Sequence, residues 1–342
     1  WLSFLPRLRG RCREATEGGW AAHLLWSVEG AGRMKPSIRI NYAAFWPGFH
    51  PDHFRRFFPY IFDKYDLVLS QDPEVVFYSV YSKGFVPYAD PRNLPRVTRF
   101  NPDKFVRVFL TGENFEPDMS SCEFAITFSS LVHHENHLRL PLWVYENRAW
   151  GFGPEGLVKR NDTDWEKIAA EKSRFCNFVY LHPVPFRDAI FRTLNAYKPV
   201  DSAGNHLNTM NGWTVPMTPS RVAGKIDFFR HYKFTLAVEN CIWPGYMTEK
   251  LVDPMFAHSI PIYVGDPQAQ LSFDTSSYLD IARFLDLKQM MEFVREVDND
   301  RALYLEMLAA PYYRNNTIPE YAHDARTLAF FDRIFASALS RR

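Results

Sequence analysis

Short apolar and β-branched runs, separated by Pro, Gly and Asp, follow one another from residue 37 to residue 146 and predict β-strands. Several of these runs carry apolar residues on both faces, which is typical of parallel strands covered by helices on each side. The runs are SIRINYAAF, LVLS, EVVFYSVY, VRVFLTGE, FAITF and LPLWVYE. The first part of the chain is therefore expected to fold into a parallel sheet.

Strand and helix patterns alternate regularly after GFGPEG at residues 151–156, a Gly- and Pro-rich segment that we interpret as a linker. Asn161 and Asp162 are expected to cap a helix that runs to Lys172. The next strands read RFCNFVY, KFTLAVEN and IPIYVGD, and the helices between them read PFRDAIFRTLNAY, SRVAGKIDFFRHY and TEKLVDPMFAHS. This βαβ order predicts a doubly wound sheet. Such sheets bind ligands beyond the carboxyl ends of their strands, so a site is expected first at residues 239–247.

Further helices are expected at residues 287–297 and 301–310, and AHDARTLAFFDRIFASAL predicts a closing amphipathic helix. The chain has 342 residues, of which 46% are apolar and 16% aromatic, so two well-packed domains are expected. Its 40 basic and 39 acidic residues nearly cancel, which gives no reason to expect nucleic acid as a partner.

The cysteines are scattered, and we interpret them as reduced thiols of a cytoplasmic protein. They are Cys12, Cys122, Cys176 and Cys241. The chain contains no apolar run of about 18 residues, so any association with the inner face of a membrane is expected to be peripheral at most. Residues 1–33 are basic and contain several glycines, and they are interpreted either as translated upstream sequence or as a segment lying on a membrane surface. The oligomeric state stays open.

The segment from Tyr232 to Pro267 carries the most chemistry. Thr248 is expected to cap a helix and Lys250 to lie in its first turn, where backbone N–H groups and the lysine charge would attract a phosphate. A diphosphate could be neutralised there without a metal. An ordinary capped helix with Glu and Lys in its first turn explains the same residues. Pro254 is expected to kink or shorten the helix.

This segment, YKFTLAVENCIWPGYMTEKLVDPMFAHSIPIYVGDP, resembles the signature of the α-1,3-fucosyltransferases of glycosyltransferase family 10, particularly the bacterial ones. In that family a strand ending in FEN or VEN is followed by a Y-x-T-E-K turn. The resemblance extends to FLTGEN at 109–114, RLPLWVYE at 139–146 and KSRFCNFVY at 172–180, and it covers about residues 36–335. It implies the GT-B architecture, in which two Rossmann-like, doubly wound α/β domains face each other across a cleft.

The resemblance also implies the domain boundaries. An extension over residues 1–35 is expected to be poorly ordered. An acceptor-binding domain is expected at 36–155 and a GDP-fucose-binding domain at 156–318. A C-terminal helix within 319–342 is expected to pack back across both domains.

Four charged residues match functional positions of the family. Glu113 resembles the general base, and Glu249 resembles a catalytic carboxylate near the donor sugar. Arg187 and Lys250 resemble the cations that hold the diphosphate of GDP-fucose. Without the resemblance, Glu113 would be read as capping a turn beside Gly112, and Arg187 as a surface helix residue.

Three uncharged residues complete the candidate site. Asn240 and Tyr246 match donor-binding positions, an amide for hydroxyl or base edges and a ring for stacking. Trp46, in FWPGFHP, is a candidate for stacking on the acceptor sugar. A place in the core is the alternative for all three, and for Trp46 this means an aromatic cluster at a strand end.

The implied reaction is the transfer of L-fucose from GDP-β-L-fucose, with inversion, to O3 of N-acetylglucosamine in a lactosamine-type glycan. One base suffices because GDP leaves as a stabilised anion, whereas a glycosidase needs two facing carboxyl groups. No obligatory cofactor is expected, and a divalent metal would be at most stimulatory. The resemblance suggests bacterial lipopolysaccharide and Lewis antigens as the setting, with the preference for α-1,3 or α-1,4 linkage open. The alternatives are an inactive glycan- or nucleotide-binding protein of the same fold and a transferase that uses another GDP-sugar.

Two acidic triplets, at residues 162–164 and 298–300, imitate the DxD metal motif of a different glycosyltransferase fold. Each precedes a helical run, where Asp is favoured as a cap. We therefore interpret both triplets as helix caps and expect no metal site.

Overall fold

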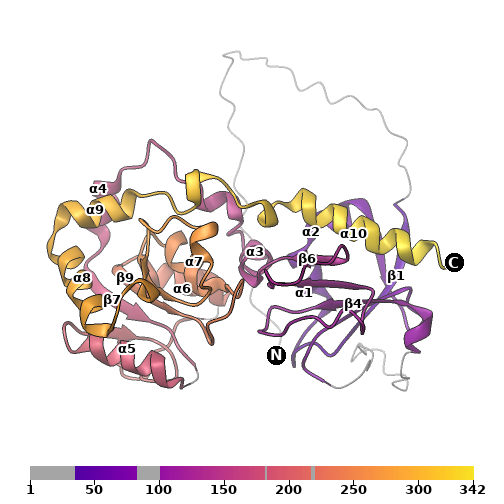
Figure 1. Cartoon of the computed structure of the whole chain (residues 1–342), viewed down its shortest axis with the longest axis horizontal. Coiled ribbons are helices and arrows are strands. Elements are labelled where there is room, and N and C mark those ends of the chain that lie inside the picture. Colours follow the sequence, from indigo (N-terminus) through magenta and orange to yellow (C-terminus); the bar gives the residue numbers. More distant parts are fainter. Residues whose placement is uncertain (1–34, 83–100, 182, 217–219) are drawn as a thin grey trace, which may run out of the picture. The chain divides into compact units, whose positions relative to one another are not determined.

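The computed structural model of the chain describes residues 35–82, 101–181, 183–216 and 220–342 (Figure 1). These residues form two fully parallel sheets with helices between the strands, which confirms the expected α/β class. Cys12 and almost all of the expected extension over 1–35 lie outside the described residues. The other three cysteines are free thiols.

The first sheet has six strands in the order β2-β1-β3-β4-β5-β6. Its order therefore reverses between β1 and β3, where parallel strands leave room for a ligand. The strands are β1 Ser37–Ala43, β2 Asp66–Leu69, β3 Val75–Tyr78, β4 Val106–Leu110, β5 Phe124–Thr127 and β6 His137–Arg139. The associated helices are α1 Pro51–Phe57, α2 Pro59–Lys64 and α3 Leu142–Arg148.

The reading of LPLWVYE as a strand is wrong. Pro141 stands at the N-cap position, and α3 begins directly after it. Trp143, Val144 and Asn147 are buried at the spacing of one helix face. A run that is apolar at nearly every position fits a buried helix as well as a buried strand, so periodicity alone could not separate the two.

The second sheet has five strands in the order β11-β10-β9-β7-β8, and it reverses between β7 and β9. The strands are β7 Arg174–Phe178, β8 Val200–Ser202, β9 Tyr232–Val238, β10 Ile260–Val264 and β11 Leu279–Asp280. The helices are α4 Trp165–Glu171, α5 Pro185–Asn195, α6 Arg221–Phe229, α7 Glu249–Phe256, α8 Leu287–Asn299 and α9 Arg301–Ala309. The doubly wound reading of this half is therefore confirmed.

Short 3₁₀ turns connect several of these elements. They are η1 Pro102–Lys104, η2 Pro154–Leu157, η3 Ala269–Leu271, η4 Ile281–Arg283, η5 Arg314–Asn316 and η6 Glu320–Ala322. Among the helices of the described ranges, none has the length and apolar character needed to cross a membrane.

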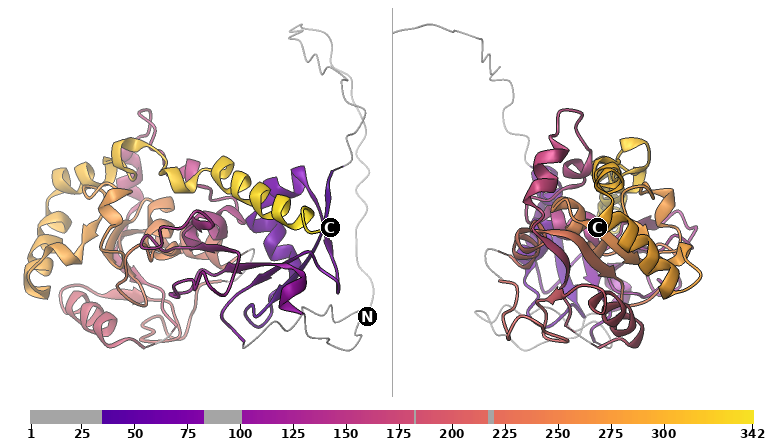
Figure 2. Two further views of the ribbon diagram at one scale, coloured as in Figure 1. Left: turned by 45° about the vertical axis from the view of Figure 1, so that its right-hand side comes forward. Right: turned by 90° about the vertical axis from the view of Figure 1, so that its left-hand side faces the viewer.

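The closing helix, α10 Asp324–Leu339, returns to the first sheet. It contacts α2, β3 and β4, and Figure 2 shows it in yellow beside the indigo strands. Phe331 is fully buried against Phe54 and Phe58, at ring-centroid distances of 6.0 and 5.3 Å. Lys64 and Tyr65 also bind Asp332, each at 2.7 Å. The segment that follows the second sheet therefore completes the core of the first.

Helix caps agree with the sequence in three places and differ in one. Thr248 caps α7, and the second Asp of each acidic triplet, Asp164 or Asp300, caps α4 or α9. The expected cap at Asn161 or Asp162 is wrong, because Asp162 pairs with Arg160 and the helix begins only at residue 165. As expected, α7 is short, and it ends two residues after Pro254.

Candidate active site

A cavity of about 450 Å³ lies at the carboxyl ends of β7 and β9, where the order of the second sheet reverses. Open α/β sheets bind their ligands at this point. Six of the seven candidate residues named from the sequence line this one cavity. They are Glu113, Arg187, Asn240, Tyr246, Glu249 and Lys250. The seventh, Trp46, lines a second cavity that shares Glu113 with the first.

Glu239, the residue that follows β9, organises this end of the sheet. Its fully buried carboxylate accepts hydrogen bonds from the backbone N–H of Thr248 at 2.7 Å and from the Thr248 hydroxyl at 2.8 Å. It also accepts one from Lys250 Nζ at 3.2 Å. A side chain at Gly265 would place Cβ 2.5 Å from Glu239 Cγ, so only glycine fits there. The sequence indicated residues 239–247 as a region but did not single out this glutamate.

The start of α7 is therefore already occupied by a carboxylate. The Thr248 N–H is bound to Glu239, and the Lys250 N–H is 3.4 Å from the Thr248 hydroxyl. These two N–H groups therefore already have partners within the protein, and phosphate binding at this helix start stays a prediction. The Lys250 side chain still lines the cavity, but it shares its charge with Glu239. Burial lowers the pKa of Lys250, yet Glu239 and Glu249 outweigh burial and hold it above its ordinary value.

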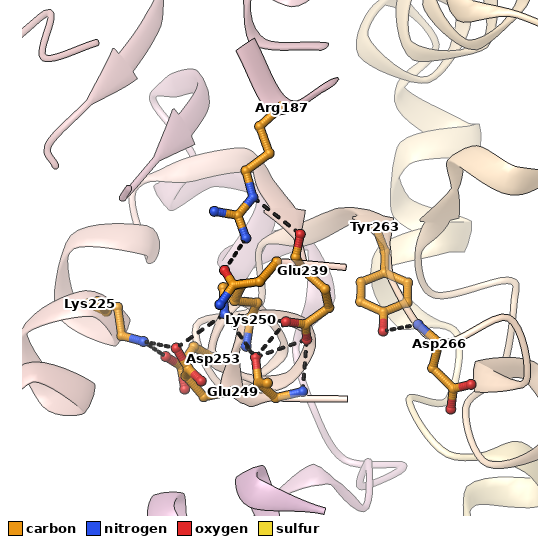
Figure 3. Close-up of polar contacts among 10 residues, drawn as sticks. Arg187, Lys225, Glu239, Glu249, Lys250, Asp253, Tyr263 and Asp266 are labelled. Carbon is orange, nitrogen blue, oxygen red and sulfur yellow. Dashed lines mark hydrogen bonds and ion pairs between the residues drawn. The ribbon is translucent and has the colours of Figure 1, made fainter. Parts of the chain in front are cut away.

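Arg187 differs from Lys250 in the kind of partners that surround its charge. It stands in the first turn of α5 with 2% of its surface exposed. Its Nε donates to the Glu239 carbonyl at 3.2 Å and its guanidinium to the Asn240 side-chain oxygen at 2.5 Å (Figure 3). It also lies over the Tyr180 ring, 4.6 Å from the centroid. Within the described residues no carboxylate lies within ion-pair distance of it, so the cavity holds a buried positive charge that lacks a counter-ion.

Lys225 of α6 is a buried cation that the sequence reasoning missed. It lies between two carboxylates one turn apart on α7, 3.3 Å from Glu249 and in direct contact with Asp253. Asn147 of α3 donates to the other oxygen of Asp253 at 2.7 Å. Burial raises the pKa of Glu249, but Lys250 and Lys225 outweigh burial and hold it well below its ordinary value. The Glu249 carboxylate is thus kept ionised and in place from two sides.

We expect Lys225→Met to lower the free energy of unfolding by about 3–5 kcal/mol, because Asp253 and Glu249 lose a shared counter-charge in a buried place. Urea unfolding at pH 7 measures this loss. Adding Asp253→Asn should restore part of it. The part of the loss that comes from Glu249 should also shrink as the pH falls, because Lys225 helps to hold the pKa of Glu249 below its ordinary value and such a carboxylate stabilises the fold only while it is ionised. Lys288→Met, at a lysine whose side chain is 85% exposed, is the control, and an equal loss in both single variants would contradict this account.

Glu113 lies in the turn after β4 and faces both cavities. Its backbone N–H is 3.1 Å from the Thr111 hydroxyl, and its carboxylate accepts a hydrogen bond from Tyr81 at 2.5 Å. A Cβ at Gly112 would come within 2.5 Å of Leu142 on α3, so this turn needs glycine to pack against the helix. Glu113 therefore lies in a tight turn beside Gly112, as the interpretation without the family resemblance expected. It also lines both cavities.

The second cavity, of about 190 Å³, lies where the order of the first sheet reverses. Trp46 follows β1, and Ser79 and Tyr81 follow β3. The Trp46 ring packs edge-on against Phe49 at 5.0 Å, yet part of it borders the cavity. Both interpretations of Trp46, as a member of an aromatic cluster and as a cavity wall, therefore agree with its position.

The two other uncharged candidates differ from each other. Asn240 is exposed and holds Arg187, so its amide oxygen is already engaged. Tyr246 is 2% exposed and packs edge-on against Phe128, at 5.1 Å between centroids. Tyr246 thus forms part of the core while one side borders the cavity.

Two family models match the chain. "Glycosyltransferase family 10 (fucosyltransferase) C-term" matches residues 171–319, and "Alpha-(1,3)-fucosyltransferase FucT N-terminal domain" matches residues 95–145. The Alpha-(1,3)-fucosyltransferase FucT of Helicobacter pylori is 26% identical over 330 residues, which cover 88% of this chain and 65% of that protein. A putative fucosyltransferase of Acanthamoeba polyphaga mimivirus is 30% identical over 231 residues, 66% of this chain and 36% of that protein. The chain thus spans less than two thirds of the length of either relative.

Solved structures agree over most of the chain. A crystal structure of an alpha1,3-fucosyltransferase with GDP matches with a TM-score of 0.68 and 26% identity, covering 90% of this chain and 93% of that one. The structure titled as the complex with GDP-fucose matches with a TM-score of 0.66 and 25% identity, covering 90% and 92%. The two-sheet arrangement is therefore the GT-B fold of these enzymes.

Proposed function

The chain belongs to glycosyltransferase family 10, and from this premise we propose that it is an α-1,3-fucosyltransferase that uses GDP-fucose as its donor. One observation carries the proposal. The cavity at the reversal of the second sheet gathers Arg187, Glu249 and Lys250 together with Glu113, which follows β4 of the first sheet. Cations for a leaving diphosphate and a carboxylate for the incoming hydroxyl are the groups that this transfer requires.

We assign the diphosphate chiefly to Arg187. Its guanidinium is buried and, in the part of the chain that the structure describes, it is hydrogen-bonded to neutral oxygen atoms and to no carboxylate, so an anion in the cavity would supply a counter-charge. Charge-assisted hydrogen bonds of this kind strengthen as negative charge grows on the departing GDP. Lys250 contributes less free charge because Glu239 shares it. We assign Glu249, which pairs with Lys225 and Lys250, either to binding sugar hydroxyls or to stabilising positive charge on the fucosyl ring.

We assign proton abstraction to Glu113. Tyr81 donates to one carboxylate oxygen, which orients the group and leaves the other oxygen available to an acceptor hydroxyl. As this proton moves to Glu113, the acceptor oxygen attacks the anomeric carbon from the side opposite GDP. A β-linked donor then gives an α-fucoside, so the reaction inverts. The second cavity, with Trp46 in its wall, would hold the acceptor sugar, for which we propose O3 of N-acetylglucosamine in a lactosamine-type glycan.

Transfer is expected to continue in excess EDTA, because Arg187 and Lys250 already place positive charge where the diphosphate would leave. The measurement is fucose transfer with and without EDTA, followed by addition of Mn²⁺. A modest stimulation by the metal agrees with this assignment. Complete loss of transfer in EDTA, restored by Mn²⁺, would contradict the proposal that these two cations suffice for the diphosphate.

The direct test of the function is incubation with GDP-fucose and a small array of acceptors, with the product linkage and anomeric configuration determined by NMR. An α-1,3-fucoside is the expected product. A donor panel separates GDP-fucose from other GDP-sugars. Tight GDP binding without transfer to any acceptor would indicate a binding protein that retains the fold, and a β-fucoside would refute inversion.

A further inference from the structure

The two cavities share four lining residues, which mark the place where they adjoin. These are Gly112, Glu113, Leu142 and Glu146. Only the two glutamates among them carry polar side chains. If donor and acceptor occupy the two cavities as proposed, the reacting hydroxyl lies beside both carboxyl groups. Glu113 has been assigned as the base, which leaves Glu146 without a role.

Glu146 stands on α3, and the contacts of its carboxyl group differ from those of the other glutamates in the cavity. Among the described residues it forms neither a hydrogen bond nor an ion pair, whereas Glu113 accepts from Tyr81 and Glu249 pairs with Lys225. A partly buried carboxyl group that faces a cavity and lacks a partner is suited to bind a ligand, because the ligand then supplies the missing hydrogen bonds.

The charges around Glu146 favour its protonated form. Burial, and then the negative charge of Glu249, raise its pKa to about 8. Asp253 acts in the same direction, and Lys225 and Lys250 act against it. Tyr81 and Tyr145 lie near enough that the charge of Glu146 contributes to raising their pKa values. At neutral pH the group is therefore mostly a carboxylic acid, which can donate one hydrogen bond and accept others.

We propose that Glu146 is a second substrate-contacting carboxyl group of this site, and that it binds a hydroxyl group of the acceptor sugar where the two cavities adjoin. The acid donates its proton in a hydrogen bond to a hydroxyl next to the one that Glu113 deprotonates. It takes no part in bond making, and its task is to orient the acceptor. This inference rests on the proposed transfer reaction, and it adds a residue of the acceptor subsite to it.

Two variants and one control test the proposal with GDP-fucose and N-acetyllactosamine. Glu146→Ala should raise the acceptor KM about 3- to 10-fold, the effect of one hydrogen bond, and leave the dissociation constant of GDP-fucose unchanged. Glu146→Gln, which keeps a neutral hydrogen-bond donor, should restore the acceptor KM at pH 7. Glu171→Gln, at an exposed carboxylate on α4, should behave as the wild type.

The pH profile separates a role in binding from a structural one. Wild-type kcat/KM for the acceptor should fall above about pH 8 as Glu146 loses its proton, and Glu146→Gln should lack this fall. An unchanged acceptor KM in Glu146→Ala, or an equal weakening of GDP-fucose binding, would overturn the proposal. If the wild type transfers no fucose, the proposed function fails by itself. Binding of N-acetyllactosamine to the wild type and to Glu146→Ala, measured by saturation-transfer NMR, then still decides the role of Glu146.

Discussion

Replacing Glu113 with glutamine is expected to lower the turnover number by about 10²–10⁴-fold, the usual contribution of a general base. Glutamine keeps the size of the side chain and a hydrogen bond with Tyr81 but cannot take a proton from the acceptor. The affinity for GDP-fucose should stay the same, because the diphosphate is assigned to Arg187 and Lys250. Steady-state transfer assays and calorimetric binding of GDP-fucose measure the two quantities.

The matched control is Glu116→Gln, three residues along the same loop. Glu116 accepts a hydrogen bond from the Trp243 indole at 2.7 Å and does not line either of the two cavities. Its replacement should leave turnover within about twofold of the wild type, as expected for an exposed position. Unchanged turnover in Glu113→Gln would eliminate the base assignment. A parallel loss of GDP-fucose affinity would place Glu113 on the donor instead.

Replacing Arg187 with methionine should reduce kcat/KM by about 10²–10³-fold, because the developing charge on GDP loses its principal partner. Its effect on stability should be small, at most about 1–2 kcal/mol. Hydrogen bonds to neutral oxygen atoms and the contact with the Tyr180 ring are lost, but a buried charge with no carboxylate partner among the described residues is also removed. Urea unfolding without ligand measures stability. The stabilisation that GDP confers on the wild type should largely disappear in this variant.

Lys250→Met is the informative comparison. It removes a cavity cation as well, but it leaves the fully buried Glu239 carboxylate without the lysine that pairs with it, so the unliganded protein should lose about 3–5 kcal/mol. Comparing the two variants distinguishes a cation that binds the ligand from a cation that stabilises the folded protein. Equal losses of stability in the two variants would show that Arg187 is a structural cation. Unimpaired GDP binding in Arg187→Met would show that Arg187 does not bind the donor.

Local sequence patterns predicted the helices and strands well where a pattern is compatible with only one type of element. The βαβ order of residues 174–264 and the caps at Thr248 and Asp300 follow from short-range rules, and the structure agrees. The strand prediction for LPLWVYE was wrong because a short apolar run is compatible with both a strand and a helix. The helices α1 and α2 were not predicted, because the reading of residues 37–146 took account only of strands.

The candidate site was predictable only as far as the resemblance reached. Glu113, Arg187, Glu249 and Lys250 stand in recognisable motifs, and they meet in one cavity. Lys225 lies outside those motifs, and its role depends on contacts with residues 24 and 28 positions away, at Glu249 and Asp253. On a helix of mixed composition a lysine indicates a solvent-facing position, so its burial could not be foreseen.

The return of α10 to the first sheet makes that half of the molecule discontinuous in sequence. Its core combines residues such as Phe54 and Phe58 with Phe331, so the strands of the second sheet are inserted between two parts of one folding unit. During synthesis, the second sheet can assemble as soon as its own segment has left the ribosome. The earlier sheet must keep an apolar face uncovered until residues 324–339 emerge, so a nascent chain would need protection from aggregation at that face.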